Sequence, residues 1–465
     1  MFSLPMLQQR TRECTFRRGL FGSDLNVHSI ETLRELMITR RPRRYKPLVA
    51  LLRSGFRHRV MIVADGEEWQ RTREAVNSAL QAGVVATDYA PVVQKVAEEA
   101  FSRLVNRAGD TAATTGFEIP VEPLMRTVTL SVLGHLLFGR ALPLEEASLM
   151  ESALTTSTEG KVEGPAAWIN RGLGAIFAAF DAGDYQPVIF SRKQRKATDQ
   201  ILAWIGNRIE EAKRAGLRPP LLEQLEVRYA SQRPALQKRS IVAEYAMICV
   251  AGIETTASAL TLAIAEIAGD DAVRDLVVRE VRHQPASGMI SQQVAARFPY
   301  LHCVFRETLR RHTIVPTFLR ETEKDYAMTE THSAAGSKQT INVPRGATLR
   351  YLPVQGHMRR SVWTEPQRFD PCRFASSLNS EQTLNYIPFG LGPQRCPGHA
   401  MATTEAILIL AEFFRRFQLE AKALASGIPL KRNVIFTNRP VGVTARIRPA
   451  GSVSTTEHLS SAGAR

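Results

Sequence analysis

The chain has 465 residues, a formal net charge of +15 and only five cysteines. Five thiols scattered along so long a chain argue against a disulfide framework and indicate a reduced, cytoplasmic protein. The large positive charge favours an acidic partner, and because the sequence has no nucleic-acid-binding motif, we expect no nucleic acid.

The N-terminal part of the chain is basic. Its first 30 residues hold several arginines but no long apolar run, so we expect neither a signal peptide nor a transmembrane anchor. A basic cluster interleaved with apolar side chains follows. A solvated face is the simpler interpretation of this cluster, and contact with a membrane surface is the alternative. The basic cluster comprises Arg40, Arg41, Arg43, Arg44, Lys46, Arg53, Arg57 and Arg59.

Two features follow the basic cluster. Trp69 and Arg73 stand four residues apart, a pattern that is weak alone and gains meaning from its order relative to later motifs. Residues 145–220 contain many glycines, which predict flexible connections suited to a lid. The apolar run 175–180 is a candidate pocket lining, although core packing is the default for such a run.

Residues 241–270 have long apolar stretches and no proline, which predicts one long buried helix. Gly252 in its middle costs roughly 1 kcal/mol relative to alanine, which indicates a packing or functional reason. Glu254 and Thr255 follow, and alone they would be an ordinary polar face. A membrane span is the other alternative, but a central glutamate would cost about 3 kcal/mol in lipid, which favours a soluble core helix. Residues 247–250 are a second candidate pocket lining, with core packing again the default.

Glu307 and Arg310 are three residues apart on a predicted helix, where most such pairs are exposed ion pairs worth about 0.2–0.5 kcal/mol. Residues 313–319 are a third candidate pocket lining, and strands are predicted at 340–343, 348–352 and 441–447. After Glu307 and Arg310, the spacing of further residues resembles that of a known family. They are His312, Pro316, Arg320, Trp363, Pro366, Phe369, Pro371, Cys372, Arg373 and Phe374.

A glycine-rich loop over residues 389–400 presents Cys396 just before an apolar helix predicted at 401–417. Its glycines permit tight turns and close approach to a flat partner. The N-terminus of the following helix would favour a thiolate, which makes Cys396 a candidate metal ligand. A buried free cysteine at a helix cap is the alternative for this loop alone.

Taken in this order, the motifs resemble those of the cytochrome P450 family, in its soluble, mostly microbial type. The loop matches the haem-binding signature of that family at Phe389, Gly392, Cys396 and Gly398, with Gln394 where an arginine is usual and Arg395 one place later. The resemblance implies one large, mainly α-helical domain with a small β region over residues 1–450, followed by a disordered tail over residues 451–465.

The resemblance also implies a haem b cofactor, with Cys396 as the thiolate ligand of its iron and Phe389 shielding the sulfur. Glu254 would feed protons from solvent, and Thr255 would hold a hydroxyl beside dioxygen. The remaining residues implied fall into two sets. Trp69, Arg73, Arg320 and Arg395 would contact the haem, and Glu307, Arg310 and Arg373 would form a buried charge network supporting the loop, with Cys372 where the family often has an acid.

The function expected from the resemblance is a haem-thiolate monooxygenase that acts on an apolar small molecule such as a terpenoid, steroid, fatty acid or polyketide. Electrons would come from a separate ferredoxin or flavodoxin with its reductase, whose acidity suits the basic chain. The alternatives are a haem-thiolate isomerase or peroxide-using enzyme, and a non-catalytic haem-binding sensor.

Overall fold

The computed structural model describes residues 7–10, 14–19, 22–28, 30–40, 42–108, 115–148, 192–284, 297–331, 338–419, 432–434 and 437–450. The expected tail at 451–465, most of the expected lid and the apolar run 175–180 lie outside the described residues. Where the cysteine side chains are described, all are free thiols, as the sequence predicted. They are Cys249, Cys303, Cys372 and Cys396.

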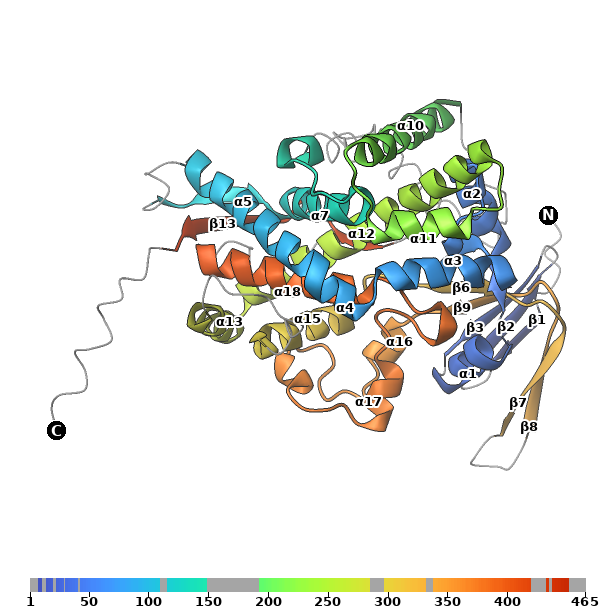
Figure 1. Cartoon of the computed structure of the whole chain (residues 1–465). Coiled ribbons are helices and arrows are strands. Elements are labelled where there is room, and N and C mark those ends of the chain that lie inside the picture. The colour runs from blue at the N-terminus through green and yellow to red at the C-terminus, as the bar shows by residue number, and fades with distance from the viewer. Residues whose placement is uncertain are drawn as a thin grey trace.

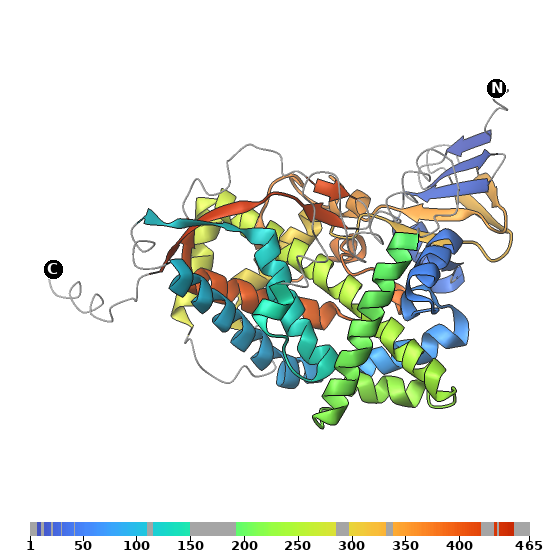
Figure 2. The ribbon, with the colours of Figure 1, turned by 90° about the horizontal axis from the view of Figure 1, so that it is seen from above.

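The predicted mainly α-helical fold is confirmed, and helices make up most of the molecule in Figures 1 and 2. The N-terminal helices are α1 (Ile30–Arg34), η1 (Glu35–Arg40), α2 (Lys46–Phe56), η2 (Met61–Val63), α3 (Gly66–Ala79), α4 (Ala82–Val84), η3 (Val85–Tyr89), α5 (Ala90–Ala108) and α7 (Val121–Phe138). The later ones are α10 (Arg192–Arg214), α11 (Pro220–Arg228), α12 (Pro234–Gly269), α13 (Asp271–His283), α15 (Pro299–His312), α16 (Val354–His357), η4 (Pro371–Phe374), α17 (Ser380–Asn385), η5 (Gly392–Gln394) and α18 (His399–Arg416).

The small β region forms four sheets among the described residues. The six-stranded sheet has the order β1 (Leu7–Arg10), β2 (Cys14–Gly19), β3 (Gly22–Val27), β9 (Thr348–Tyr351), β6 (Phe318–Glu321) and β4 (Arg43–Arg44). The three-stranded sheet has the order β10 (Phe417–Leu419), β13 (Thr444–Pro449) and β5 (Phe117–Pro120). The two-stranded sheets pair β7 (Tyr326–Thr331) with β8 (Lys338–Val343), and β11 (Arg432–Val434) with β12 (Asn438–Pro440).

The long helix predicted at 241–270 is α12, which begins at Pro234, seven residues earlier than predicted. The prediction missed the first turns because they are polar, whereas proline at the first helical position is a regular start. Among the helices described, α12 is the one long and apolar enough to cross a membrane, and 72% of its most apolar window is buried inside the protein. Its apolar character therefore fits a core helix.

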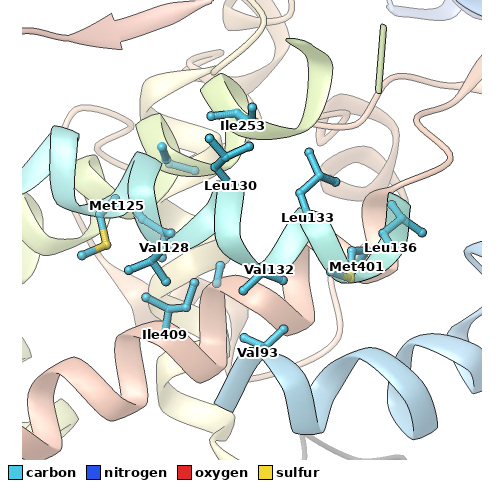
Figure 3. Close-up of a cluster of buried hydrophobic side chains, with 14 of the residues drawn as sticks. Val93, Met125, Val128, Leu130, Val132, Leu133, Leu136, Ile253, Met401 and Ile409 are labelled. Carbon is cyan, nitrogen blue, oxygen red and sulfur yellow. The ribbon is translucent and has the colours of Figure 1, made fainter. Parts of the chain in front are cut away.

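The hydrophobic core lies between α5, α7, α12 and α18, whose side chains meet in one apolar cluster (Figure 3). Helix α7 is apolar on almost every side, and such a helix is stable only when surrounded by other elements. Leu133 of α7 lies against Gly252, where an added β-carbon would meet it at 3.6 Å, an ordinary contact. Packing between these helices therefore does not by itself require the glycine.

The strands predicted at 340–343 and 348–352 are β8 and β9, which belong to different sheets. Strand β9 pairs in parallel with β3 and antiparallel with β6. Strand β6 in turn pairs with β4, so that Arg320 stands directly opposite Arg44. Because opposite residues of a strand pair project to the same face, this pairing places two arginines side by side.

Candidate functional site

The loop that carries Cys396 is shaped by its glycines. Gly390 and Gly392 have φ angles of 77° and 68°, in the left-handed region where glycine has no steric penalty. The turn brings the N–H of Cys396 to the carbonyl oxygen of Phe389 at 2.8 Å. The cysteine is thereby held three residues before the first residue of α18, at His399.

The Cys396 side chain is accessible to solvent, yet protein atoms surround it densely. Burial raises the pKa of its thiol, while the backbone N–H of Gly398 and the charges of Arg73 and Arg395 act in the opposite direction. A thiol in such surroundings stays protonated unless a cation binds it, because a coordinated metal ion deprotonates its thiol ligand. Cys396 is therefore suited to a metal ion.

Arg44 lies near both Arg320 and Arg73, and Arg73 interacts with Cys396. Burial and the neighbouring Arg320 lower the pKa of Arg44, and burial lowers the pKa of Arg320 to about 10. Burial also lowers the pKa of Arg73, although the nearby Cys396 raises it. The Nε atoms of all three have no hydrogen-bond partner within the described part of the chain. Asp65 is the acid that interacts with Arg44 and Arg320.

Arg44 and Arg320 share one carboxylate, that of Asp65, and the neighbouring Arg73 adds a third, partly buried cation. The three guanidinium groups therefore leave an excess of positive charge in surroundings that disfavour it. An anionic ligand with more than one negative group would correct this imbalance and satisfy the orphaned N–H donors. Arg73 interacts with both Arg44 and Cys396. The anionic end of such a ligand would therefore lie close to the cysteine sulfur.

Helix α12 has an accessible face in its otherwise buried middle. This accessible face consists of Ile248, Ala251, Gly252 and Thr255, which are partly exposed and follow helical spacing. The Thr255 hydroxyl donates a hydrogen bond to the carbonyl oxygen of Ala251, at 2.7 Å. Small side chains and a hydroxyl at this point leave room for a ligand against the helix.

Glu254 does not share this face and is buried. The Thr437 hydroxyl donates to its Oε1 at 2.7 Å, and Nη2 of Arg126 lies 3.9 Å from its Oε2. Two residues far apart in the sequence thus hold this carboxylate. Sequence reasoning missed both, because nothing local distinguishes Arg126 or Thr437 from ordinary polar residues.

Glu307 and Arg310 on α15 are both fully buried and form a bidentate ion pair, with N···O distances of 2.6 and 2.7 Å. Arg310 also donates to the carbonyl oxygens of His357 and Pro366, each at 2.8 Å. Nε of Arg373 lies 3.4 Å from Glu307. The three charged residues predicted as a network therefore do meet, in the interior.

His357 connects this network to the cysteine loop and was not singled out in the sequence. Burial lowers the pKa of its imidazole to about 3, so the ring is neutral. Its Nε2 accepts the N–H of Ile387 at 3.1 Å, which leaves Nδ1 to donate to the Thr313 hydroxyl at 2.9 Å. Ile387 lies two residues before Phe389, so His357 anchors the start of the loop.

The other predicted haem contacts differ in their placement. Trp69 is half buried on α3, one turn before Arg73, and Phe389 is half buried with its ring 6.2 Å from that of His399. Arg395 is exposed, whereas Gln394 beside it has a buried Oε1 without a hydrogen-bond partner among the described residues. Of these two neighbouring loop residues, Gln394 is the one that points its polar atom into the protein.

The basic cluster is mostly engaged within the protein. Arg43 and Lys46 pair with Glu321, Arg57 with Asp199, and Arg59 with Asp65 and Glu68. Arg44 is buried toward the site described above. The interpretation of the whole cluster as a solvated face is therefore wrong for Arg44, because strand pairing turns this residue inward.

Comparison with known proteins identifies the family. The family model "Cytochrome P450" matches residues 23–444, and the chain belongs to this family. It is similar to "Probable cytochrome P450 6a14" of Drosophila melanogaster, with 25% identity over 407 residues, 81% of this chain and 75% of the relative. It is also similar to "Cytochrome P450 6a2" of the same fly, with 22% identity over 385 residues, 79% of this chain and 72% of the relative.

A mammalian relative is "Cytochrome P450 3A12" of Canis lupus familiaris, with 27% identity over 225 residues, 47% of this chain and 42% of the relative. These relatives come from animals, so they do not support the microbial type that the sequence suggested. As a family member the protein is a monooxygenase-type oxidoreductase, and its cofactor is haem b. The excess arginine charge beside an accessible thiol fits the two propionates and the iron of that cofactor.

Proposed function

We propose that the protein inserts one oxygen atom from dioxygen into an apolar small molecule, of the terpenoid, steroid, fatty acid or polyketide class, using electrons from a separate donor. The accessible face of α12 carries this proposal, because it sets small and apolar side chains beside one hydroxyl, with a buried carboxylate next to it. The partly exposed run 315–318 adds further apolar lining.

Haem, when bound, supplies the activation of dioxygen and the acceptance of electrons. Cys396 would be its thiolate ligand, with Phe389 beside the sulfur. Its propionates would lie against Arg73 and Arg320, as predicted, and against Arg44, whose inward placement supports adding it to this set. Trp69 and Arg395 remain predicted contacts, and Gln394 offers a hydrogen bond in place of the usual arginine.

Proton supply would fall to Glu254 and Thr255. The Thr255 hydroxyl stands on the accessible face and can hold a water that carries protons toward dioxygen. Glu254 would exchange protons with solvent and replenish that water. Glu307, Arg310 and Arg373 would act indirectly, by fixing the segment that leads into the cysteine loop.

Carbon monoxide binding to the reduced protein tests the ligand assignment. The expected result is the red-shifted Soret band of thiolate-ligated haem, because Cys396 is a soft anionic ligand. Cys396→His should abolish this band, and Cys372→Ser, which removes another exposed thiol, should retain it. Persistence of the band in Cys396→His would show that a different cysteine binds the iron.

Thr255→Ala separates monooxygenation from the alternatives. Without the hydroxyl, product formed per reducing equivalent consumed should fall and hydrogen peroxide should rise, while the carbon monoxide spectrum stays the same. Thr255→Ser keeps the hydroxyl and is the matched control. An isomerase or peroxide-using enzyme would not depend on this residue for dioxygen activation, and a sensor would form no product. Unchanged coupling in Thr255→Ala would refute the role assigned to the hydroxyl.

The substrate and the donor need separate experiments. Spectral shifts of the haem across a library of terpenoids, steroids, fatty acids and polyketides would identify the class that binds. For the donor we propose an acidic ferredoxin or flavodoxin in the cytoplasm, because the chain carries a net charge of +15. Its reduction rate should fall as salt rises, since screening limits charge interactions to about 8 Å near physiological ionic strength. A salt-independent rate would contradict this pairing.

A further inference from the structure

A chain of buried ion pairs runs behind the accessible face of α12. Glu122 and Arg126 are one turn apart on α7, with Nε of Arg126 2.8 Å from Oε1 of Glu122. Arg126 also faces Glu254 at 3.9 Å, and Nε of Arg439 lies 3.0 Å from Oε1 of Glu122. The side chains are 10% exposed at Glu254, 5% at Arg126, 9% at Glu122 and 23% at Arg439. The chain of charges thus extends from the interior toward solvent.

These charges are costly where they stand. Met125 and Val128, close to Arg126 in sequence, are fully buried in the apolar core shown in Figure 3. Replacing a buried ion pair by well-packed apolar side chains is often neutral or stabilising, so such a pair is weak evidence for a role in stability. A charged pair on an otherwise apolar helix therefore points to a task that an apolar pair cannot perform.

We propose that Arg126 is a positioning residue for proton delivery, holding Glu254 in line with Glu122 and Arg439 along the route by which Glu254 communicates with solvent. This inference rests on the role proposed above for Glu254. Each oxygen of Glu254 has its own partner, with Thr437 at Oε1 and Arg126 at Oε2.

The geometry explains why an arginine is needed. Its planar guanidinium reaches two carboxylates at once, with Nε toward Glu122 and Nη2 toward Glu254. The contact with Glu254 is longer than the contact with Glu122, so the arginine is anchored on its own helix and holds Glu254 less tightly. A carboxylate held in this way keeps its place and can still exchange protons.

The test begins with folding rather than turnover. Arg126→Gln, Glu254→Gln and the double variant are compared by urea unfolding of the haem-loaded protein. If the two side chains are coupled, Arg126→Gln leaves an uncompensated buried carboxylate, and adding Glu254→Gln restores part of the lost stability. If the losses of unfolding free energy in the two single variants add up to the loss in the double variant, the two side chains are not paired and the inference fails.

The second readout concerns protons. With the compound that gives the largest spectral shift and a surrogate ferredoxin with its reductase, Arg126→Gln should release more hydrogen peroxide per NADPH. It should also enlarge the solvent deuterium isotope effect on product formation, which a purely structural role would leave unchanged. Arg126→Lys should restore coupling in part. Arg208→Gln removes an arginine from a partly buried ion pair on α10 and should not alter either quantity.

The outcomes separate this inference from the proposed function. If Glu254→Gln forms as much product per NADPH as the wild type, the proposed role of Glu254 fails. If Glu254→Gln uncouples while Arg126→Gln does not, only the role of Arg126 is refuted. Should Arg126→Gln fail to fold, Arg126→Lys and Thr437→Val replace it, because neither buries an unpaired carboxylate. Wild-type coupling and isotope effects in both of these variants would overturn the inference.

Discussion

The buried pair of Glu307 and Arg310 gives a sharp prediction for Glu307→Gln, which keeps the shape of the side chain and removes its charge. Both side chains have 0% exposure, and two N–H groups of Arg310 lie 2.6 and 2.7 Å from the carboxylate. At an effective dielectric constant near 20, a charge pair about 4 Å apart is worth about 4 kcal/mol. Breaking a buried pair typically costs about 3–5 kcal/mol, because the remaining charge has no counter-charge.

A loss of about 4 kcal/mol is a large part of the usual stability of a domain. We therefore expect Glu307→Gln to unfold at much lower urea concentration and to yield little haem-loaded protein, as measured by circular dichroism and by the carbon monoxide spectrum. The control is Glu365→Gln, which breaks the pair of Glu365 and Arg368. That pair has the same spacing, but both of its side chains are 70% exposed, and exposed pairs contribute little. A Glu307→Gln variant within about 1 kcal/mol of the wild type, with full haem loading, would refute the reasoning.

Four further predictions concern pH, packing and haem retention. The pKa of His357 is about 3 in the folded protein, below its ordinary value of 6.5. The free energy of unfolding should therefore be highest above pH 6.5 and fall as pH drops toward 3, with a loss of about 2 kcal/mol at pH 5. Burial raises the pKa of Glu244 to about 7, so the free energy of unfolding should fall as pH rises through 7 and the buried carboxyl group loses its proton. Glu244→Gln, which cannot ionise, should therefore be about 3 kcal/mol more stable than the wild type at pH 8. In Gly356→Ala the new β-carbon would meet a backbone oxygen at 2.9 Å, which should destabilise the fold by about 1–3 kcal/mol, whereas Gly83→Ala has open space. Arg44→Gln should speed haem transfer to apomyoglobin, since it removes a cation proposed to face the propionates.

Each of these predictions has an outcome that contradicts it. Unfolding in urea at several pH values measures the first two. If His357→Phe loses stability at low pH as the wild type does, His357 is not the titrating group. If Glu244→Gln is no more stable than the wild type at pH 8, the prediction for Glu244 is wrong. Equal stabilities of Gly356→Ala and Gly83→Ala would mean that the backbone oxygen near position 356 yields easily. If Arg44→Gln transfers haem to apomyoglobin at the wild-type rate, Arg44 does not contact the propionates.

Much of the site could be predicted because it depends on local preferences. Gly390 and Gly392 were assigned to tight turns, and both have the left-handed backbone that glycine adopts without strain. The helices predicted at Glu307 and after Cys396 are present as α15 and α18. Boundaries were less accurate where polar first turns hid the beginning of a helix, as at Pro234.

The residues that sequence reasoning missed are those whose position depends on distant partners. Arg44 was counted in the basic cluster, yet its strand pairs with β6, opposite Arg320. Arg126 looks like any helix residue until α7 packs against α12 beside Glu254. His357 carried no local signal, because its ring is defined by Thr313 and Ile387, 44 and 30 residues away.

The sequence by itself contained the family motifs, because these are short segments of fixed spacing. Their resemblance to the cytochrome P450 family implied the mainly helical fold and singled out Cys396 as the expected haem ligand. Tertiary structure alone decided which charges Arg44 and Glu254 meet. Strand pairing turned Arg44 inward, and helix packing joined Arg126 to Glu254. The physical reason is that a charge becomes stable in the interior only through a particular partner, and that partner is selected by the packing of whole elements rather than by neighbours along the chain.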